Sequence, residues 1–366
     1  MKVGVLGGGQ LGRMLALAGY PLGIHTRFLE RRSDCPAGYL EEVTVGAYDD
    51  PQALETFAQD IDVATFEFEN VPESAARFLS GRVPVYPPPA SLGVTQDRLA
   101  EKRLFEELGI ATAPFRAVDS LDQLHAALDA LGPPVVLKRR RLGYDGKGQT
   151  VIRSADEIAP AWAHLGDAAG VLESFIEFER ELSLISVRGR DGEIRHYPPC
   201  HNVHRDGILN VTIAPALDLD ATMVAAAEQA NRRILEHFQY VGVLTVEYFV
   251  SGSALLANET APRVHNSGHW TIEGADASQF ENHLRAILGL PLGSTRAVGF
   301  CGMINLIGTV PPLADLLRLP GVHVHLYGKE PRPGRKLGHL TVFDATREGM
   351  MRQFRALRGV AMSMEI

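Results

Sequence analysis

The stretch VGVLTVEYFVSGSALLANE, residues 241–259, decides the fold of the C-terminal part of this chain. Apolar and polar residues alternate in the two arms that flank Ser251-Gly252-Ser253. This pattern predicts two antiparallel strands with one buried face. With a three-residue loop, Glu247 lies opposite or diagonal to Glu259, and their Cβ atoms are roughly 4.5–8 Å apart. Two such carboxylates on a core-facing surface repel each other and lose hydration, and Mg²⁺ relieves both effects. In the alternative, both acids point to solvent, which needs an even-numbered loop or a bulge.

The totals of the chain limit the class of protein. Its 366 residues suggest two or three domains, and 45% hydrophobic with 22% charged residues is typical of a globular protein without membrane spans. A net charge of −8 argues against a nucleic-acid partner. The three cysteines are far apart and form no CxxC pair, so we expect reduced thiols and a cytoplasmic protein. No apolar run approaches the roughly 18 residues of a membrane span.

Upstream, the first ninety residues alternate short apolar runs with helical patterns, which predicts a doubly wound parallel sheet. The predicted strands are 3–6, 26–29, 43–45, 63–66 and 83–86, and the predicted helices are 11–18, 51–58 and 72–79. Three prolines in YPPPAS, residues 86–91, interrupt this pattern.

A second region begins with a predicted helix at 97–108. Strand-like PPVVLKRR, a glycine-rich loop at 142–149 and TVIR follow, which indicates a small lid of strands and two helices. Alternating strands such as ELSLISVRG, with a long helix at 221–238, make up the rest. We therefore expect an N-terminal domain at 1–94, a lid at 95–172 and a C-terminal domain at 173–366.

Two glycine-rich segments suggest phosphate binding. In LKRRRLGYDGKGQT, Lys138 ends a strand and Gly143, Gly146 and Gly148 let backbone N–H groups approach phosphate oxygens. The alternative is a hairpin turn with solvated basic residues. In GVLGGGQLGRM, residues 4–14, a strand, a glycine turn and a helix match the dinucleotide-binding fingerprint, and Glu30 lies about 20 residues on. That pattern, which is weak evidence on its own, raises a nicotinamide-dependent oxidoreductase as one alternative.

Two further segments are rich in hydrogen-bond donors. NETAPRVHNSGHWT, residues 258–271, suits a polar anionic small molecule. His265 and His269 have the spacing of a helical zinc site, but Asn-Ser-Gly between them indicates a loop, so zinc is disfavoured. GKEPRPGRKLGH, residues 328–339, reads as an anion clamp or as an exposed basic loop.

Together these segments resemble the ATP-grasp enzymes and, more closely, the family of N5-carboxyaminoimidazole ribonucleotide synthases of purine biosynthesis. The resemblance covers essentially the whole chain and rests on motifs in the family order: GGGQLGRM, TFEFENV, GYDGKGQ, RELSLI, NVHRDGIL, NETAPRVHNSGHWT, QFENHLRA and GRKLGH. It implies an ATP-grasp fold of class α/β and α+β, with an N-terminal doubly wound parallel-sheet domain, a small central lid and a larger C-terminal antiparallel-sheet domain.

The resemblance also implies an activity. It is the ATP- and bicarbonate-dependent carboxylation of 5-aminoimidazole ribonucleotide through carboxyphosphate, with Mg²⁺, in a cytoplasmic homodimer that binds neither nucleic acid nor membrane. By this resemblance the glycine turn near the N-terminus lies close to a substrate phosphate. A formate-dependent glycinamide ribonucleotide transformylase shares the architecture. Two different classes stay open beside it: a nicotinamide oxidoreductase and a nucleotide sensor without catalysis.

The motifs carry site residues over to this chain. The implied nucleotide set is Arg98, Lys138, Gly143, Tyr144, Asp145, Gly146, Lys147, Gly148, Gln149, Glu173, Ser174, Phe175, Ile176, Glu181, His204, Asn258 and Glu259. The implied metal ligands are Glu247 and Glu259, and the implied substrate residues are Gln10, Leu11, Glu67, Arg263, His265 and Asn266. The implied catalytic set is Tyr144, Asp145, His265, Lys329, Arg335 and Lys336.

Overall fold

The computed structural model describes residues 1–143, 148–166 and 168–362. An N-terminal parallel sheet has the strand order β3-β2-β1-β4. Its strands are β1 (Lys2–Leu6), β2 (His25–Glu30), β3 (Glu42–Val45) and β4 (Val63–Phe66). Four of the five predicted strands are thereby confirmed. The fifth, at 83–86, makes only an isolated bridge between Ala64 and Val85. Pro84 and Pro87 have no N–H to donate, so a longer ladder cannot form.

Helices connect the parallel strands as predicted. They are α1 (Gln10–Gly19), the 3₁₀ turn η1 (Tyr20–Leu22), α2 (Pro51–Phe57) and α3 (Glu73–Ser80). The proline run does not end all regular structure, because α4 (Pro89–Thr95) begins with its last proline. Proline is tolerated in the first turn of a helix, where no intrahelical partner for its N–H is needed.

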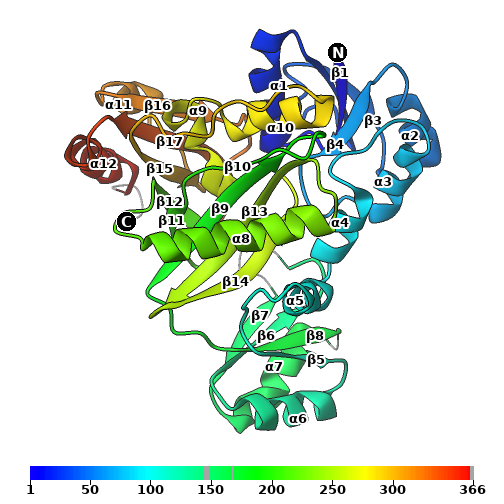
Figure 1. Ribbon diagram of the computed structural model, residues 1–366, viewed down its shortest axis with the longest axis vertical. Coiled ribbons are helices and arrows are strands. Elements are labelled where there is room, and N and C mark those ends of the chain that lie inside the picture. The colour runs from blue at the N-terminus through cyan, green and yellow to red at the C-terminus, as the bar shows by residue number, and fades with distance from the viewer. Residues whose placement is uncertain (144–147, 167, 363–366) are drawn as a thin grey trace.

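The lid is a four-stranded antiparallel sheet of order β5-β8-β6-β7, which projects from the rest of the molecule (Figure 1). Its elements are β5 (Phe115–Val118), α6 (Leu121–Leu131), β6 (Val135–Arg139), β7 (Gln149–Ile152), η2 (Ala155–Glu157), α7 (Ile158–Leu165) and β8 (Gly170–Ser174). Leu124, Leu137, Leu165 and Leu172 form its own apolar core. The predicted lid of strands and two helices is therefore present.

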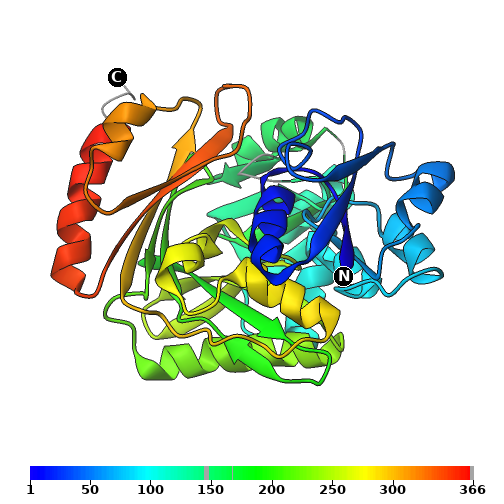
Figure 2. The same ribbon diagram turned by 90° about the horizontal axis from the view of Figure 1, so that it is seen from above.

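A larger antiparallel sheet forms the body, in the order β14-β13-β9-β11-β12-β15-β17-β16, with β10 beside β9. Its strands are β9 (Arg180–Arg188), β10 (Ile194–His196), β11 (Cys200–Arg205), β12 (Ile208–Ala214), β13 (Gly242–Ser251), β14 (Ala254–Ala261), β15 (Phe300–Ile307), β16 (Val322–Leu326) and β17 (Lys336–Asp344). The helices are α5 (Arg98–Glu107), α8 (Ala221–His237), η3 (Asn266–Gly268), α9 (Thr271–Gly274), α10 (Gln279–Leu288), α11 (Leu313–Leu317) and α12 (Arg347–Met362). Figure 1 shows α8 lying along one face of the sheet, and Figure 2 shows α12 against β15 and β17.

The hairpin β13–β14 has the predicted pairing for a different reason. Ser251 pairs with Ala254, so the turn contains two residues, Gly252 and Ser253, and the expected three-residue loop is wrong. Tyr248 pairs with Ala257 whereas Glu247 pairs with Glu259, which leaves Asn258 as the extra residue of a β-bulge. The bulge compensates for the shorter turn and puts the two glutamates opposite each other.

One apolar core joins the parallel sheet to the body. Val5 and Phe28 of the N-terminal sheet belong to the same buried cluster as Ile185, Phe280 and Leu284. Figure 2 shows α1 beside α10 at this contact, where the hydroxyl of Thr65 also lies 2.9 Å from His283 Nε2. This packing fixes the ends of the parallel strands relative to the body sheet.

Two expectations from composition concern the cysteines and membranes. Cys35, Cys200 and Cys301 are all buried and free. Over the described part of the chain, no helix has the length and apolar character needed to cross a membrane.

Candidate active site

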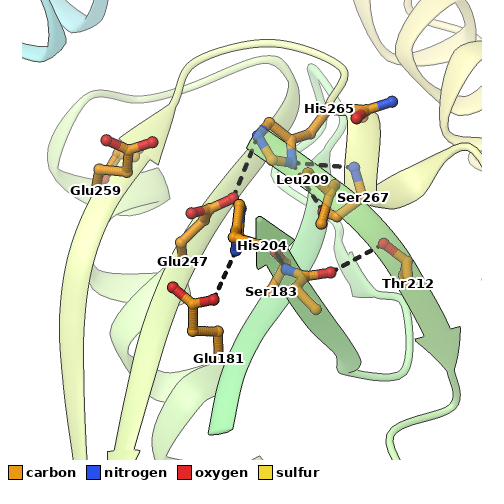
Figure 3. Close-up of polar contacts among 12 residues, drawn as sticks. Glu181, Ser183, His204, Leu209, Thr212, Glu247, Glu259, His265 and Ser267 are labelled. Carbon is orange, nitrogen blue, oxygen red and sulfur yellow. Dashed lines mark hydrogen bonds and ion pairs between the residues drawn. The ribbon is translucent and has the colours of Figure 1, made fainter. Parts of the chain in front are cut away.

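Glu247 lies at the centre of the site. It is on β13 of the body sheet, and its neighbours come from β14, β11 and the segment after β14. Its Oε1 is 3.6 Å from His265 Nε2. Figure 3 shows Glu247, His204 and His265 converging from three segments of the chain. Burial, and after it the negative charge of Glu259, raises the pKa of Glu247 to about 7. A cation bound between the two carboxylates would relieve their repulsion.

Glu259 pairs with Glu247 across the hairpin, and Asn258 precedes Glu259 in the bulge. Glu259 accepts a hydrogen bond of 3.1 Å from Arg98 Nη1, at the beginning of α5. The side-chain Oδ1 of Asn258 is buried and has no hydrogen-bond partner within the described residues. Carboxylate and amide oxygens are the ligands that Mg²⁺ accepts, so these three residues fit the ion. The turn and the bulge of the hairpin place Glu247 opposite Glu259, with Asn258 directly before Glu259.

Lys138, at the end of β6, contacts a buried carboxylate. Its Nζ lies 3.0 Å from Glu173 Oε2, and Lys102 Nζ lies 3.2 Å from the same oxygen. Burial raises the pKa of Glu173, but the two ammonium groups outweigh that effect and bring it down to about 2. The resemblance places Glu173 in the nucleotide set, and in the structure its side chain forms a charge cluster with Lys138 and Lys102.

A second charged pair comes from neighbouring strands of the body. Figure 3 shows the contact between His204 on β11 and Glu181 on β9. The distance from His204 Nδ1 to Glu181 Oε2 is 2.6 Å. Burial lowers the pKa of His204, but the bond to Glu181 and the charge of Glu247 raise it above its usual value. The imidazole is therefore poised to carry a positive charge close to Glu247.

The segment after β8 places the remaining residues of the implied nucleotide set. Ser174 N–H donates to Pro114 O at 2.9 Å, and Phe175 N–H donates to Pro134 O at 3.1 Å. Phe175 is partly exposed, and Ile176 follows in an irregular segment that leads to β9. Of the glycine loop, Gly143, Gly148 and Gln149 are described, with Gly148 at φ +73° before β7. Tyr144, Asp145, Gly146 and Lys147 lie outside the described residues.

On the other side of Glu247, the implied substrate residues are held by polar contacts. Arg263 Nε donates to Glu69 Oε2, whose pKa Arg263 lowers against the opposing effect of burial. The imidazole of His265 contacts Ser267 Oγ at 2.8 Å through Nδ1. Asn266 and Asn305 exchange two amide hydrogen bonds of 3.1 and 2.6 Å. These contacts hold Arg263, His265 and Asn266 as one preorganised group.

Three cations of the basic segment 328–339 differ in the contacts that they make. Lys336 begins β17 and interacts electrostatically with Glu69, Glu247 and His265. Lys329 donates to the side chain of Gln10. Arg335 is partly exposed, and its Nη1 donates to the carbonyl of Glu330 at 3.0 Å.

The glycine turn near the N-terminus is occupied by the chain's own carboxylates. Glu67 accepts hydrogen bonds from the amides of Gly9 and Gly12, the latter at 2.6 Å. Gly8 N–H donates to Glu30 Oε2 at 3.1 Å. A dinucleotide or phosphate would need these amides, and its charge would face two carboxylates. The side chain of Leu11 is buried in the core beneath the turn.

Sequence reasoning missed Lys102, Glu69 and Asn305. Glu69 follows Glu67 with the period of a strand, in TFEFENV, so it could have been chosen with it. Asn305 is the single amide in the apolar strand FCGMINLI, which is the usual signal of a buried polar role. Lys102 has no such signal, because a lysine within the helix RLAEKRLFEE reads as solvated.

Comparisons with known proteins identify the family of this chain. Residues 1–96 match the model of the ribonucleotide synthetase preATP-grasp domain, 103–280 the ATP-grasp domain and 301–353 the phosphoribosylaminoimidazole carboxylase C-terminal domain. The N5-carboxyaminoimidazole ribonucleotide synthase of Pseudomonas aeruginosa is 51% identical over 347 residues, which cover 95% of this chain and 96% of the relative. That of Escherichia coli K12 is 43% identical over 345 residues, covering 94% and 90%.

Solved structures of N5-carboxyaminoimidazole ribonucleotide synthases also resemble this chain over nearly its whole length. The crystal structure of N5-carboxyaminoimidazole ribonucleotide synthetase from Thermus thermophilus has a TM-score of 0.95 at 49% identity and covers 98% of both chains. The Aspergillus clavatus synthase in complex with ADP and 5-aminoimidazole ribonucleotide has a TM-score of 0.93 at 32% identity over 99% of both chains. This chain has the ATP-grasp fold and belongs to the family of N5-carboxyaminoimidazole ribonucleotide synthases.

Proposed function

We propose that this chain uses ATP to join bicarbonate to the exocyclic amine of 5-aminoimidazole ribonucleotide, with release of ADP and phosphate. One observation carries the proposal: Glu247 faces the Glu259–Arg98 pair on one side and His265 on the other. A nucleotide site and a ribonucleotide site therefore meet at one carboxylate. The names of the relatives, and the two ligands bound in the Aspergillus clavatus complex, support the same substrates.

On the nucleotide side, Lys138, Arg98 and the glycine loop bind and orient the phosphates of ATP. Their positive charges and backbone N–H groups offset the charge that develops as the γ-phosphoryl group is transferred. Glu247 and Glu259, with Asn258 before Glu259, would hold Mg²⁺, and the bound ion would further offset the phosphate charge. Glu181, His204 and the segment 173–176 complete the nucleotide site, together with residues 144–147 of the glycine loop.

On the substrate side of Glu247, the anionic substrates are bound by Arg263, His265, Asn266 and Lys336. The edge of this substrate site contains Gln10, Glu67, Lys329 and Arg335. A bicarbonate oxygen attacks the γ-phosphorus, ADP leaves and carboxyphosphate forms. The amine then attacks the carboxyl carbon, and the bond from carbon to the bridging oxygen breaks. Because carboxyphosphate hydrolyses readily, the lid must exclude water while it exists.

The proton of the attacking amine needs an acceptor. Burial, together with the positive charge of Arg263, holds the pKa of His265 well below its usual value, so the imidazole is neutral at physiological pH. A neutral imidazole next to Glu247 can accept a proton and pass it on. His265 is therefore one candidate base, and Asp145 on the glycine loop is the other. The rates of His265→Ala and Asp145→Asn with bound substrates decide between them.

An isotope experiment tests the reaction. Bicarbonate enriched in ¹⁸O transfers one labelled oxygen to inorganic phosphate, because that oxygen bridges carbon and phosphorus before the C–O bond breaks. ADP release is measured in parallel, with bicarbonate and with or without the ribonucleotide. Label transferred from formate would instead indicate the transformylase, and strict dependence on NAD without phosphate release would indicate an oxidoreductase. Unlabelled phosphate during turnover, with exchange against water excluded, contradicts the carboxyphosphate route.

We also propose a cytoplasmic homodimer, as the resemblance implies. Sedimentation at micromolar concentration tests the assembly, and a single monomeric species would contradict it.

A further inference from the structure

Lys102 is a buried cation that the proposed chemistry leaves without a role. It lies on α5 and is only 1% exposed. Its Nζ contacts three oxygens: Glu173 Oε2 at 3.2 Å, Thr112 Oγ1 at 2.9 Å and Ala257 O at 3.5 Å. Burial of an ammonium group is unfavourable and lowers the pKa of Lys102, and Glu173 opposes that effect. The charge of Lys102 is therefore balanced chiefly by Glu173.

The same carboxylate oxygen also holds Lys138. Lys138 Nζ lies 3.0 Å from Glu173 Oε2, so two ammonium groups share one oxygen. The side chain of Lys138 is 11% exposed, whereas that of Lys102 is 2% exposed and has two further protein acceptors. An incoming phosphate can therefore draw Lys138 away from Glu173, while Lys102 stays in place.

The position of α5 gives Lys102 a second contact with the site. Figure 1 shows α5 between the lid strands and the hairpin β13–β14. Arg98 N–H, at the beginning of α5, donates to the carbonyl of Arg140 in the lid at 3.0 Å. The carbonyl of Ala257, which Lys102 contacts, directly precedes the bulge residue Asn258. The ammonium of Lys102 thus joins the base of the lid to the strand that carries Glu259.

We infer that Lys102 is a positioning residue, which neutralises Glu173 so that Lys138 can leave it and bind a phosphate of the nucleotide. Without Lys102, release of Lys138 would leave the buried Glu173 carboxylate with no ammonium group in contact and only the electrostatic interaction with Arg98, so Glu173 would retain Lys138. The inference deepens the proposed function, because it rests on Lys138 binding ATP.

Replacement of Lys102 tests this by an effect that a merely structural residue would not produce. The affinities of Lys102→Met for ADP and for the β,γ-imido analogue of ATP are measured by calorimetry, as is the affinity for the ribonucleotide. We expect about tenfold weaker binding of the ATP analogue, with ribonucleotide binding unchanged. Adding Glu173→Gln removes the charge that retains Lys138, so the double variant K102M/E173Q should recover most of the lost affinity.

Arg103→Met is the matched control, because Arg103 is the next residue of α5, is exposed and loses the same charge. Its nucleotide affinity should equal that of the unmodified chain. Undiminished affinity in K102M, or a double variant that binds no better than K102M, overturns the inference. If K102M does not fold by circular dichroism, Lys102→Gln replaces it in both comparisons. Failure of the proposed function is seen separately, as absence of bicarbonate-dependent ADP release by the unmodified chain.

Discussion

At the residue scale, Glu247 holds a proton more tightly in the folded chain than in the unfolded one. Burial raises its pKa from 4.5 to about 7, with a further contribution from Glu259. A raised folded-state pKa contributes stability that is fully present below about pH 4.5 and is lost as the pH rises through 7. Without divalent cations, the free energy of unfolding should therefore fall across this pH interval, because the buried Glu247 loses its proton.

Glu247→Gln provides the measurement. In the presence of a chelator, the free energy of unfolding of the unmodified chain should fall relative to the variant between pH 5 and pH 8, by up to about 3 kcal/mol. The variant lacks the titrating group and so lacks this component. Denaturant titrations at each pH give the two curves, and parallel curves would show that Glu247 titrates as an ordinary glutamate.

Glu259→Gln keeps the size of the side chain and removes its charge. We expect turnover to fall on the order of 100-fold even at saturating Mg²⁺, because the variant cannot hold the cation that offsets phosphate charge. Its melting temperature should change little, since the side chain of Glu259 is 42% exposed. Glu236→Gln, on the exposed face of α8, is the control for the substitution itself. Near-normal turnover would refute the metal-binding role.

At the element scale, the turn before α1 depends on Glu67, and a stability effect follows from this. Both of its carboxylate oxygens accept from backbone N–H groups at the beginning of the helix. In Glu67→Gln one acceptor becomes an NH₂ group that faces an N–H, so a buried donor loses its partner. We expect a loss of about 1–3 kcal/mol in the free energy of unfolding.

Glu55→Gln is the comparison for this element, because Glu55 forms an exposed ion pair with Arg82. Such pairs contribute roughly 0–1 kcal/mol, so this variant should stay close to the unmodified chain. Equal effects of the two substitutions in denaturant titrations would mean that Glu67 does not stabilise the turn.

The helices, strands and turns also show which features can be predicted from local sequence patterns and which cannot. Short apolar runs predict β1, β2 and β4 because most residues of these strands are buried, whereas β3 is a partly exposed edge strand with only two valines. The same rules cannot separate an odd turn from an even turn with a bulge, and only the ladder shows that Asn258 is the extra residue. For the glycine turn, the pattern indicates where backbone amides converge but not which anion satisfies them. Glu67 directly follows β4, more than fifty residues along the chain from the glycine turn, so local sequence patterns cannot show that the two meet.

At the scale of the whole molecule, the nucleotide side and the ribonucleotide side of the site are built from different regions of the chain. A substitution on one side should therefore change the KM for one substrate and leave the KM for the other nearly unchanged. Lys336 begins β17, whereas Lys138 lies near the end of β6 of the lid. Lys336→Ala should raise the KM for the ribonucleotide about tenfold, as expected for loss of a charged contact, and leave the KM for ATP nearly unchanged. Arg335→Ala tests the neighbouring, more exposed cation in the same assay. If the KM for ATP rises instead, Lys336 belongs to the nucleotide side.

The sequence motifs predicted the family, the ATP-grasp fold and the pairing of Glu247 with Glu259. They could not predict the shared core of the parallel sheet and the body, since Phe28 and Leu284 meet only through tertiary packing. The same applies to Lys102, whose burial depends on the hairpin and the lid closing around α5. Residues with a chemical signature were recognised, whereas residues made important by their surroundings were not.

The order of strands in the body has a consequence for synthesis on the ribosome. Strand β15 pairs with β12, although a long helix, a hairpin and α10 are translated between them. Until β15 emerges, the outer edge of β12 presents unpaired amides and carbonyls to any other strand. A nascent chain that stalls before β15 therefore carries an open sheet edge. We expect such fragments to aggregate or to be captured by chaperones rather than to persist as folded, inactive protein.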